Sequence, residues 1–132
     1  MSVVLDTHAA IWYVFIRKRL SKDALRLIRR TVDSGRPAYV SAISIVETIY
    51  LIERGRVPLE AIQRLEAGLK DPMSGLLVVP VDEEIADAVH QVPRNLVPEM
   101  PDRIIAATAL RLGLPLITRD GRIAAAGMKT IW

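Results

Sequence analysis

Short apolar runs alternate with longer segments that are apolar on one face only. The short runs predict buried strands, and the longer segments, with apolar residues three and four positions apart, predict helices. The expected strands are 2–6, 38–41, 76–81, 115–118 and 128–132, and the expected helices are 7–15, 23–30, 43–54, 58–70, 83–92 and 102–112. Strands that alternate with helices form parallel βαβ units. The pattern therefore predicts an α/β fold with a parallel β-sheet sandwiched between α-helices.

Capping and turn residues mark the ends of several of these helices. Thr7 can cap the first helix, and Pro58 suits the first turn of the helix at 58–70. The prolines of segment 93–101 predict an irregular connection, so that the next helix begins at Asp102. No linker, internal repeat or low-complexity segment interrupts the chain. We expect residues 1–132 to form one domain.

Composition narrows the possible chemistry. The chain of 132 residues contains no cysteine, which excludes disulfides, thiolate metal sites and a cysteine nucleophile. A net charge of +3 is only a mild bias toward polyanions. The first residues lack a basic segment before their short apolar run, and no uncharged stretch approaches the roughly 20 residues of a membrane span. We expect a cytoplasmic protein without a membrane partner.

Four acidic residues stand where such a fold gathers its active site. Asp6 ends the first strand, Asp120 follows the strand at 115–118, Asp102 opens a helix, and Glu47 lies early in the helix after the second strand. Ligands of open α/β sheets bind outside the carboxyl ends of the strands. Carboxylates gathered there repel one another and need a cation, and oxygen-only ligands suit Mg²⁺ or Mn²⁺. The cluster predicts metal-assisted phosphoryl chemistry.

Each acid also has a possible local role. Asp6 could cap the first helix, Asp102 could complement the positive end of its helix, and Asp120 precedes Gly121 in a frequent turn pair. Glu47 follows Ser44 with the spacing of a capping box. These local roles do not explain why all four acids fall at one edge of the sheet.

Other polar residues carry weaker signals. Thr118, two residues before Asp120, could bind a carboxylate, a metal-bound water or a phosphate, or face the core. His8 and His90 lack metal-ligand spacing. The basic segment 17–19 and the arginines of the second helix are more often solvated faces than RNA contacts. No glycine-rich phosphate loop and no Gly-x-Ser-x-Gly elbow is present.

The segments 5–8, 41–47, 101–109 and 116–120 resemble, in order, the signature segments of PIN-domain ribonucleases. The closest likeness is to VapC-type toxins of prokaryotic toxin–antitoxin pairs, and it covers nearly the whole chain. One departure is the run 99–101, where relatives often carry an Asp-Pro step and a small residue before the third acid. This difference affects the shape of the substrate loop.

The resemblance implies a metal-binding set and a biological role. The family's metal-binding and catalytic acids fall on Asp6, Glu47, Asp102 and Asp120, and its supporting hydroxyl falls on Thr118. It implies Mg²⁺ or Mn²⁺ as the cofactor and hydrolysis of RNA by metal-activated water. It also implies homodimers and a VapB-like antitoxin as partner.

Two rival functions come from other classes of protein. A non-catalytic PIN module would bind RNA or a protein partner only, and retention of all four acids argues against it. A receiver-like phosphoacceptor domain would need a pair of acids after the first strand, and Asp6 has no acidic neighbour.

The helix at 43–54 is more apolar than contact with a single core requires. Its apolar residues are Ile43, Ile45, Val46, Ile49, Tyr50, Leu51 and Ile52. We expect some of them to bury against another chain, either a second copy or an antitoxin segment. The alternative is a helix enclosed by its own domain.

Overall fold

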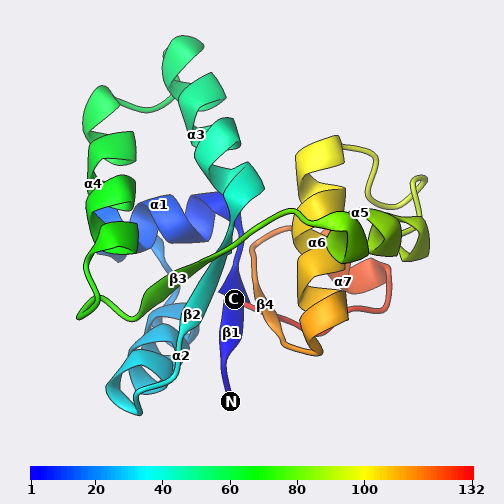
Figure 1. The fold of residues 1–132 in the computed structure, drawn as a ribbon, viewed down its shortest axis with the longest axis horizontal. Helices are drawn as coiled ribbons and strands as arrows, with labels where there is room; N and C mark the ends of the chain where they lie inside the picture. Colours follow the sequence, from blue (N-terminus) through cyan, green and yellow to red (C-terminus); the bar gives the residue numbers. More distant parts are fainter.

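A five-stranded parallel sheet forms the centre of the computed structural model, which describes all 132 residues (Figure 1). The strands are β1 (Val3–Leu5), β2 (Ala38–Ser41), β3 (Leu76–Val79), β4 (Leu116–Ile117) and β5 (Thr130–Ile131). Their order is β3-β2-β1-β4-β5. The chain therefore adds β2 and β3 on one side of β1 and later adds β4 and β5 on the other. The carboxyl ends of β1 and β4 flank the point where the strand order reverses, which is where α/β sheets bind ligands.

Seven helices surround the sheet. They are α1 (Thr7–Phe15), α2 (Lys22–Asp33), α3 (Ala42–Glu53), α4 (Leu59–Lys70), α5 (Glu83–Ala88), α6 (Met100–Leu112) and α7 (Gly121–Ala125), with short 3-10 turns at Arg17–Arg19 and Val89–Gln91. Residues of α1, α2 and α4 form one core with the sheet, and residues of α5, α6 and α7 form another. The α3 helix contacts α1, α4 and α6. The predicted α/β sandwich is confirmed.

The central strand explains why there are two cores. Val3 and Leu5 point into the core formed with α1, α2 and α4, whereas Val4 points into the core formed with α6. All three side chains are fully buried. A strand covered by helices on both faces is apolar at every position. The apolar run before Asp6 therefore places this carboxylate at the carboxyl end of a fully buried strand.

Three predicted helix starts need correction. The α6 helix begins at Met100 and contains Pro101 in its first turn, where the missing N–H costs no hydrogen bond. Asp102 is thus the third helical residue. Pro58 is the cap of α4 and lies outside its first turn. Thr7 is the first residue of α1, and Asp6 takes the capping position.

The turn before β3 contains Gly75, whose backbone packs closely against Val32 of α2. Gly75 has a φ of +79°, and a Cβ there would lie 2.6 Å from Cγ1 of Val32. Gly35 has the same φ, but a Cβ there would meet no atom within 4 Å. We expect Gly75→Ala to lower the free energy of unfolding by roughly 2–4 kcal/mol, the sum of left-handed backbone strain and overpacking, and Gly35→Ala by about 1 kcal/mol. Urea unfolding of both variants measures the difference, and equal losses would contradict the packing seen here.

Candidate active site

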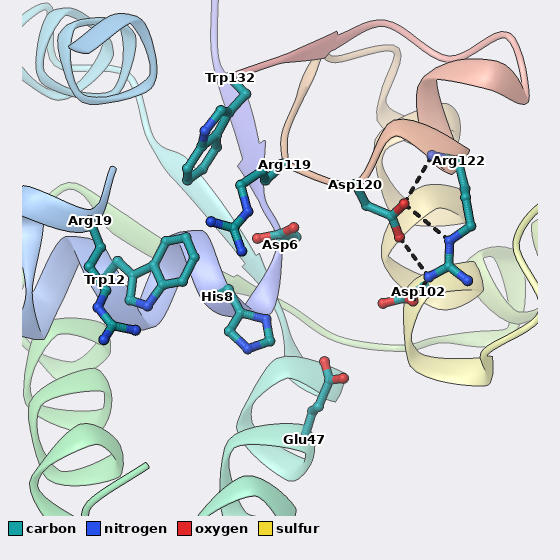
Figure 2. A pocket seen from close by; sticks show the side chains of 10 residues that line it. All are labelled: Asp6, His8, Trp12, Arg19, Glu47, Asp102, Arg119, Asp120, Arg122 and Trp132. Atoms are coloured by element: carbon teal, nitrogen blue, oxygen red, sulfur yellow. Dashed lines mark hydrogen bonds and ion pairs between the residues drawn. The ribbon is translucent and has the colours of Figure 1, made fainter. Parts of the chain in front are cut away.

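An open pocket at the carboxyl end of the sheet contains all four acids singled out in the sequence. Its volume is about 520 Å³. Figure 2 shows the side chains that line it: Asp6, His8, Trp12, Arg19, Glu47, Asp102, Arg119, Asp120, Arg122 and Trp132. The acids come from four places in the fold, namely the β1–α1 junction, α3, α6 and the loop between β4 and α7. The fold thus brings together residues that are distant in the sequence.

Asp6 is fixed at the junction of β1, β4 and α1. Its backbone N–H donates to the carbonyl of Ile117 at 3.1 Å, and its Oδ1 accepts from the N–H of Ala9 at 2.8 Å. Part of Asp6 is open to the pocket, but protein surrounds its carboxyl. Burial raises the pKa of Asp6, and the Thr118 hydroxyl and the Ala9 N–H oppose this rise. Asp6 therefore caps α1 and also presents a partly desolvated carboxyl to the pocket.

Glu47 does not belong to a capping box. The helix begins one turn earlier, because the Ser41 hydroxyl accepts from the N–H of Ile43 at 3.2 Å. Glu47 lies in the second turn, where the buried Thr7 hydroxyl donates a hydrogen bond to its carboxylate. The hydroxyls of Thr7 and Ser44 are hydrogen-bonded to each other at 2.9 Å. These buried contacts between α1 and α3 hold Glu47 at the pocket.

Asp102 lies near enough to the other three acids for their charges to affect its pKa. Its pKa is raised to about 6, first by burial and then by the negative charges of Glu47, Asp120 and Asp6. The positive charge of Arg122 only partly opposes this rise. Because three separate carboxylates affect one proton equilibrium, the four acids form an electrostatic cluster.

Arg122 occupies the acidic side of the pocket. Its Nη2 lies 3.0 Å from Oδ2 of Asp120 and 3.9 Å from Oδ2 of Asp102. The Asp120 Oδ1 also accepts from the backbone N–H of Arg122 at 2.9 Å, which caps α7. The hydrogen bond to the Arg122 side chain lowers the pKa of Asp120. Thr118 lies beneath this loop, buried, with its hydroxyl accepting from the Asp120 N–H at 3.1 Å.

The acids have the chemistry of a metal site, although their side chains are turned toward protein partners. Arg122 pairs with Asp120, and Thr7 donates to Glu47. In these positions no group of three acidic or histidine side chains is close enough to hold one ion. The donors are all carboxylate oxygens, which fit Mg²⁺ or Mn²⁺, and a cation would relieve the repulsion that raises the Asp102 pKa. For Asp120 to join a metal site, its carboxylate would have to turn from Arg122 to the cation.

Several pocket residues were missed by sequence reasoning. Both tryptophans of the chain, Trp12 and Trp132, line the pocket, as do Arg19 and Arg119. One signal was available, because His8 and Trp12 are four residues apart and share one face of α1. Arg19 belongs to the basic segment 17–19, for which the sequence favoured a solvated face over an RNA contact.

Comparison with known proteins identifies the fold. The family model of the PIN domain matches residues 3–128. This chain belongs to the PIN domain family. This chain is 31% identical over 122 residues to Ribonuclease VapC22 of Mycobacterium tuberculosis (strain ATCC 25618 / H37Rv). The match covers 92% of this chain and 89% of that protein. The predicted family resemblance is confirmed.

Solved structures share the same architecture. VapBC2 from Rickettsia felis, bound to a DNA fragment from its promoter, matches with a TM-score of 0.73 and 12% identity, covering 99% of this chain and 98% of that chain. DNA-bound VapBC from Salmonella typhimurium matches with a TM-score of 0.67 and 21% identity, covering 99% and 97%. At these identities the likeness concerns the fold. No helix of this PIN domain is long and apolar enough to cross a membrane.

The raised pKa of Asp102 predicts a pH-dependent gain in stability when its charge is removed. The folded-state pKa of about 6 exceeds the ordinary aspartate value of 3.8, so the folded state binds the proton more tightly. Asp102 therefore costs no stability when protonated in both states and destabilises the fold increasingly as pH rises through this window. In metal-free buffer we expect Asp102→Asn to raise the free energy of unfolding at pH 8 by on the order of 1–3 kcal/mol. This gain should shrink toward zero near pH 4.

Urea unfolding in EDTA at several pH values provides the measurement. Asp87→Asn is the matched control, because it removes the same charge from an exposed position on α5 outside the pocket. A gain for Asp102→Asn that is independent of pH would contradict the electrostatic origin of the effect.

Proposed function

We propose that this PIN domain is a divalent-metal-dependent endoribonuclease and the toxin of a VapBC-type toxin–antitoxin pair. The observation that carries the proposal is the pocket in which four carboxylates from separate elements face two unpaired guanidinium groups. The relative at 31% identity, which covers most of both chains, is named as a ribonuclease. A polyanionic substrate fits a pocket that joins cationic side chains to a cation-binding set of acids.

The proposed cofactor is Mg²⁺ or Mn²⁺, held by Asp6, Glu47, Asp102 and Asp120. Such an ion would supply charge that activates a water and offsets negative charge on phosphate oxygens. The cleavage is hydrolysis by water, and the ribose 2′-hydroxyl is not the nucleophile. The expected products therefore carry a 5′-phosphate and a 3′-hydroxyl.

The chain's own residues prepare this site. The Ala9 N–H orients the Asp6 carboxyl, and the Thr7 hydroxyl orients Glu47. Thr118 supports the loop that carries Asp120 through its bond to the Asp120 N–H. Arg122 balances the negative charge on Asp120. With a cation bound to Asp120, the Arg122 guanidinium would be free to bind a phosphate oxygen.

The Asp6→Asn variant tests the catalytic assignment. Asparagine keeps the shape and can still accept the Ala9 N–H, so the fold should persist while one negative ligand is lost. We expect RNA cleavage to fall by more than roughly 100-fold, because even residues that only support metal ligands contribute 10- to 100-fold. Cleavage of a labelled RNA in Mg²⁺ and the end groups of the products provide the measurement.

EDTA and Asp87→Asn complete this experiment. Excess EDTA should stop cleavage by the wild-type protein, and added Mn²⁺ should restore it, whereas Asp87→Asn should cleave normally. Full activity of Asp6→Asn, or undiminished cleavage in EDTA, would overturn the proposed mechanism. A protein that binds RNA but never cleaves it would be the non-catalytic PIN module instead.

The partners that we propose, a VapB-like antitoxin and a second copy of the chain, have a candidate surface on α3. Only polar residues of α3, Ser44 and Thr48, are buried. The apolar side chains of Val46, Ile49 and Tyr50 are 47%, 39% and 57% exposed. An exposed apolar helix face of this kind is typical of a protein interface.

Adding a charge to this face tests its role in assembly. We expect Val46→Glu to weaken self-association and binding of a co-expressed antitoxin by at least about tenfold, because the carboxylate would be desolvated at the contact. Leu110→Glu is the matched control, since Leu110 is a similarly exposed apolar residue on α6. Light scattering with and without the partner provides the measurement. A wild-type protein that stays monomeric at high concentration and binds no antitoxin would contradict the assignment.

A further inference from the structure

One side of the pocket is aromatic and cationic, and Asp6 lies at its border with the acidic side. Figure 2 shows Trp12, Arg19, Arg119 and Trp132 on the side away from Asp102 and Asp120. His8 lies at the boundary between the two sides, on the same face of α1 as Trp12. We call His8, Trp12, Arg19, Arg119 and Trp132 the aromatic–basic wall. The four acids account for the chemistry of cleavage, but they do not account for this wall.

Trp12 is the centre of the wall. Trp12 is 8% exposed, and three other members of the wall lie around its ring. The His8 ring lies 5.5 Å away between centroids, and the Trp132 ring lies 5.6 Å away in an edge-on arrangement. The Arg119 guanidinium carbon lies 5.3 Å from the Trp12 ring centroid, within the range of a cation–π contact. Trp12 is thus a positioning residue. It orients the exposed side chains of His8 and Arg119 and the partly exposed ring of Trp132.

The two arginines of the wall have no anionic partner within the chain. The ion pairs of the structure involve Arg26, Arg111 and Arg122, and neither Arg19 nor Arg119 donates a side-chain hydrogen bond. Arg17, in the same turn as Arg19, instead donates to the Tyr13 carbonyl at 2.9 Å and covers the Tyr13 ring. Two exposed guanidiniums at the pocket are therefore free to bind an anion.

We propose that the aromatic–basic wall binds an unpaired nucleotide next to the phosphate that is cleaved. The base would stack on Trp132, and Arg19 and Arg119 would bind the flanking phosphates. The face of a base is free for stacking only in single-stranded RNA, and a basic groove with aromatic platforms is the usual arrangement for such strands. This assignment rests on the proposed function, because it names the form of RNA that the same pocket accepts.

The connection to the acids is direct. Arg119 precedes Asp120 in the chain, and Figure 2 shows its guanidinium between Trp132 and Asp6. A phosphate bound by Arg119 would therefore lie beside the carboxylates. The wall would determine which phosphate of a strand reaches them.

Binding without metal tests the wall independently of cleavage. The only tryptophans of the chain are Trp12 and Trp132, so tryptophan fluorescence reports directly on the pocket. In EDTA we expect a short single-stranded RNA of mixed sequence to quench this fluorescence. The same sequence as a duplex should bind at least about tenfold more weakly, because its base faces are covered. Equal affinity for the duplex would overturn the proposal.

Substitutions at Trp132 separate stacking from packing. From the usual effect of removing one stacked base contact, we expect Trp132→Ala to lose about 5- to 150-fold in affinity, measured by anisotropy of labelled RNA. Trp132→Phe keeps an aromatic face and should stay within roughly tenfold of the wild type, closer than the alanine variant. Wild-type affinity of Trp132→Ala would remove the stacking role.

Substitutions of arginine separate a specific phosphate contact from net charge. Affinity falls as salt rises, and we expect Arg119→Ala to make the slope of log affinity against log salt shallower by about 0.7. This is the value for one phosphate contact on a single strand. Arg30→Ala removes the same charge from an exposed position on α2 and should leave the slope unchanged. Equal effects of the two variants would show that only overall charge matters, which would overturn the proposal.

The outcomes distinguish this inference from the proposed function. If the wild-type protein cleaves RNA while Trp132→Ala and Arg119→Ala bind RNA like the wild type, the proposed role of the aromatic–basic wall is wrong and the proposed nuclease function is supported. If the expected binding losses appear but no cleavage is found, the wall is supported and the nuclease assignment fails.

Discussion

Mutual repulsion among four carboxylates is the constraint on which the rest of this site depends. The charges of Glu47, Asp120 and Asp6 help to raise the pKa of Asp102 to about 6, and burial raises the pKa of Asp6 itself. A fold gains nothing from such an arrangement by itself. The surrounding contacts are those expected of a cluster that must be held in place, with a helix amide on Asp6, a buried hydroxyl on Glu47 and a guanidinium on Asp120.

The topology makes this convergence possible. Asp6 and Thr118 follow directly after the paired residues Leu5 and Ile117 of neighbouring parallel strands, at the point where the strand order reverses. The same edge receives Trp132, because β5 pairs with β4 through Ile131 and Ile117. One edge of the sheet therefore supplies both the acids and part of the aromatic–basic wall. This explains how a small domain can place the proposed catalytic and substrate-binding groups in one pocket.

Much of this arrangement could be predicted from local patterns. The apolar run before Asp6 indicated a buried strand, and carboxylates at strand ends indicated a shared edge. Helix starts were less certain, since a proline is compatible with both a loop and a first turn, as Pro101 shows. The partners of charged side chains could not be predicted. Nothing local distinguishes Arg119, which turns to Trp12, from Arg122, which pairs with Asp120. Trp12 and Trp132 meet only because of the strand order.

The most direct test of a shared cation site is calorimetric titration of the metal-free protein with Mn²⁺ at about pH 8, above the Asp102 pKa of about 6. The wild-type protein should bind Mn²⁺, and Arg122→Ala should bind it more tightly, because Asp120 then loses its competing partner. Glu47→Gln should lose most of the affinity, whereas Asp87→Asn should retain it. Undetectable binding to the wild-type protein at millimolar Mn²⁺, or unchanged binding to Glu47→Gln, would contradict the proposal that these acids form one metal site.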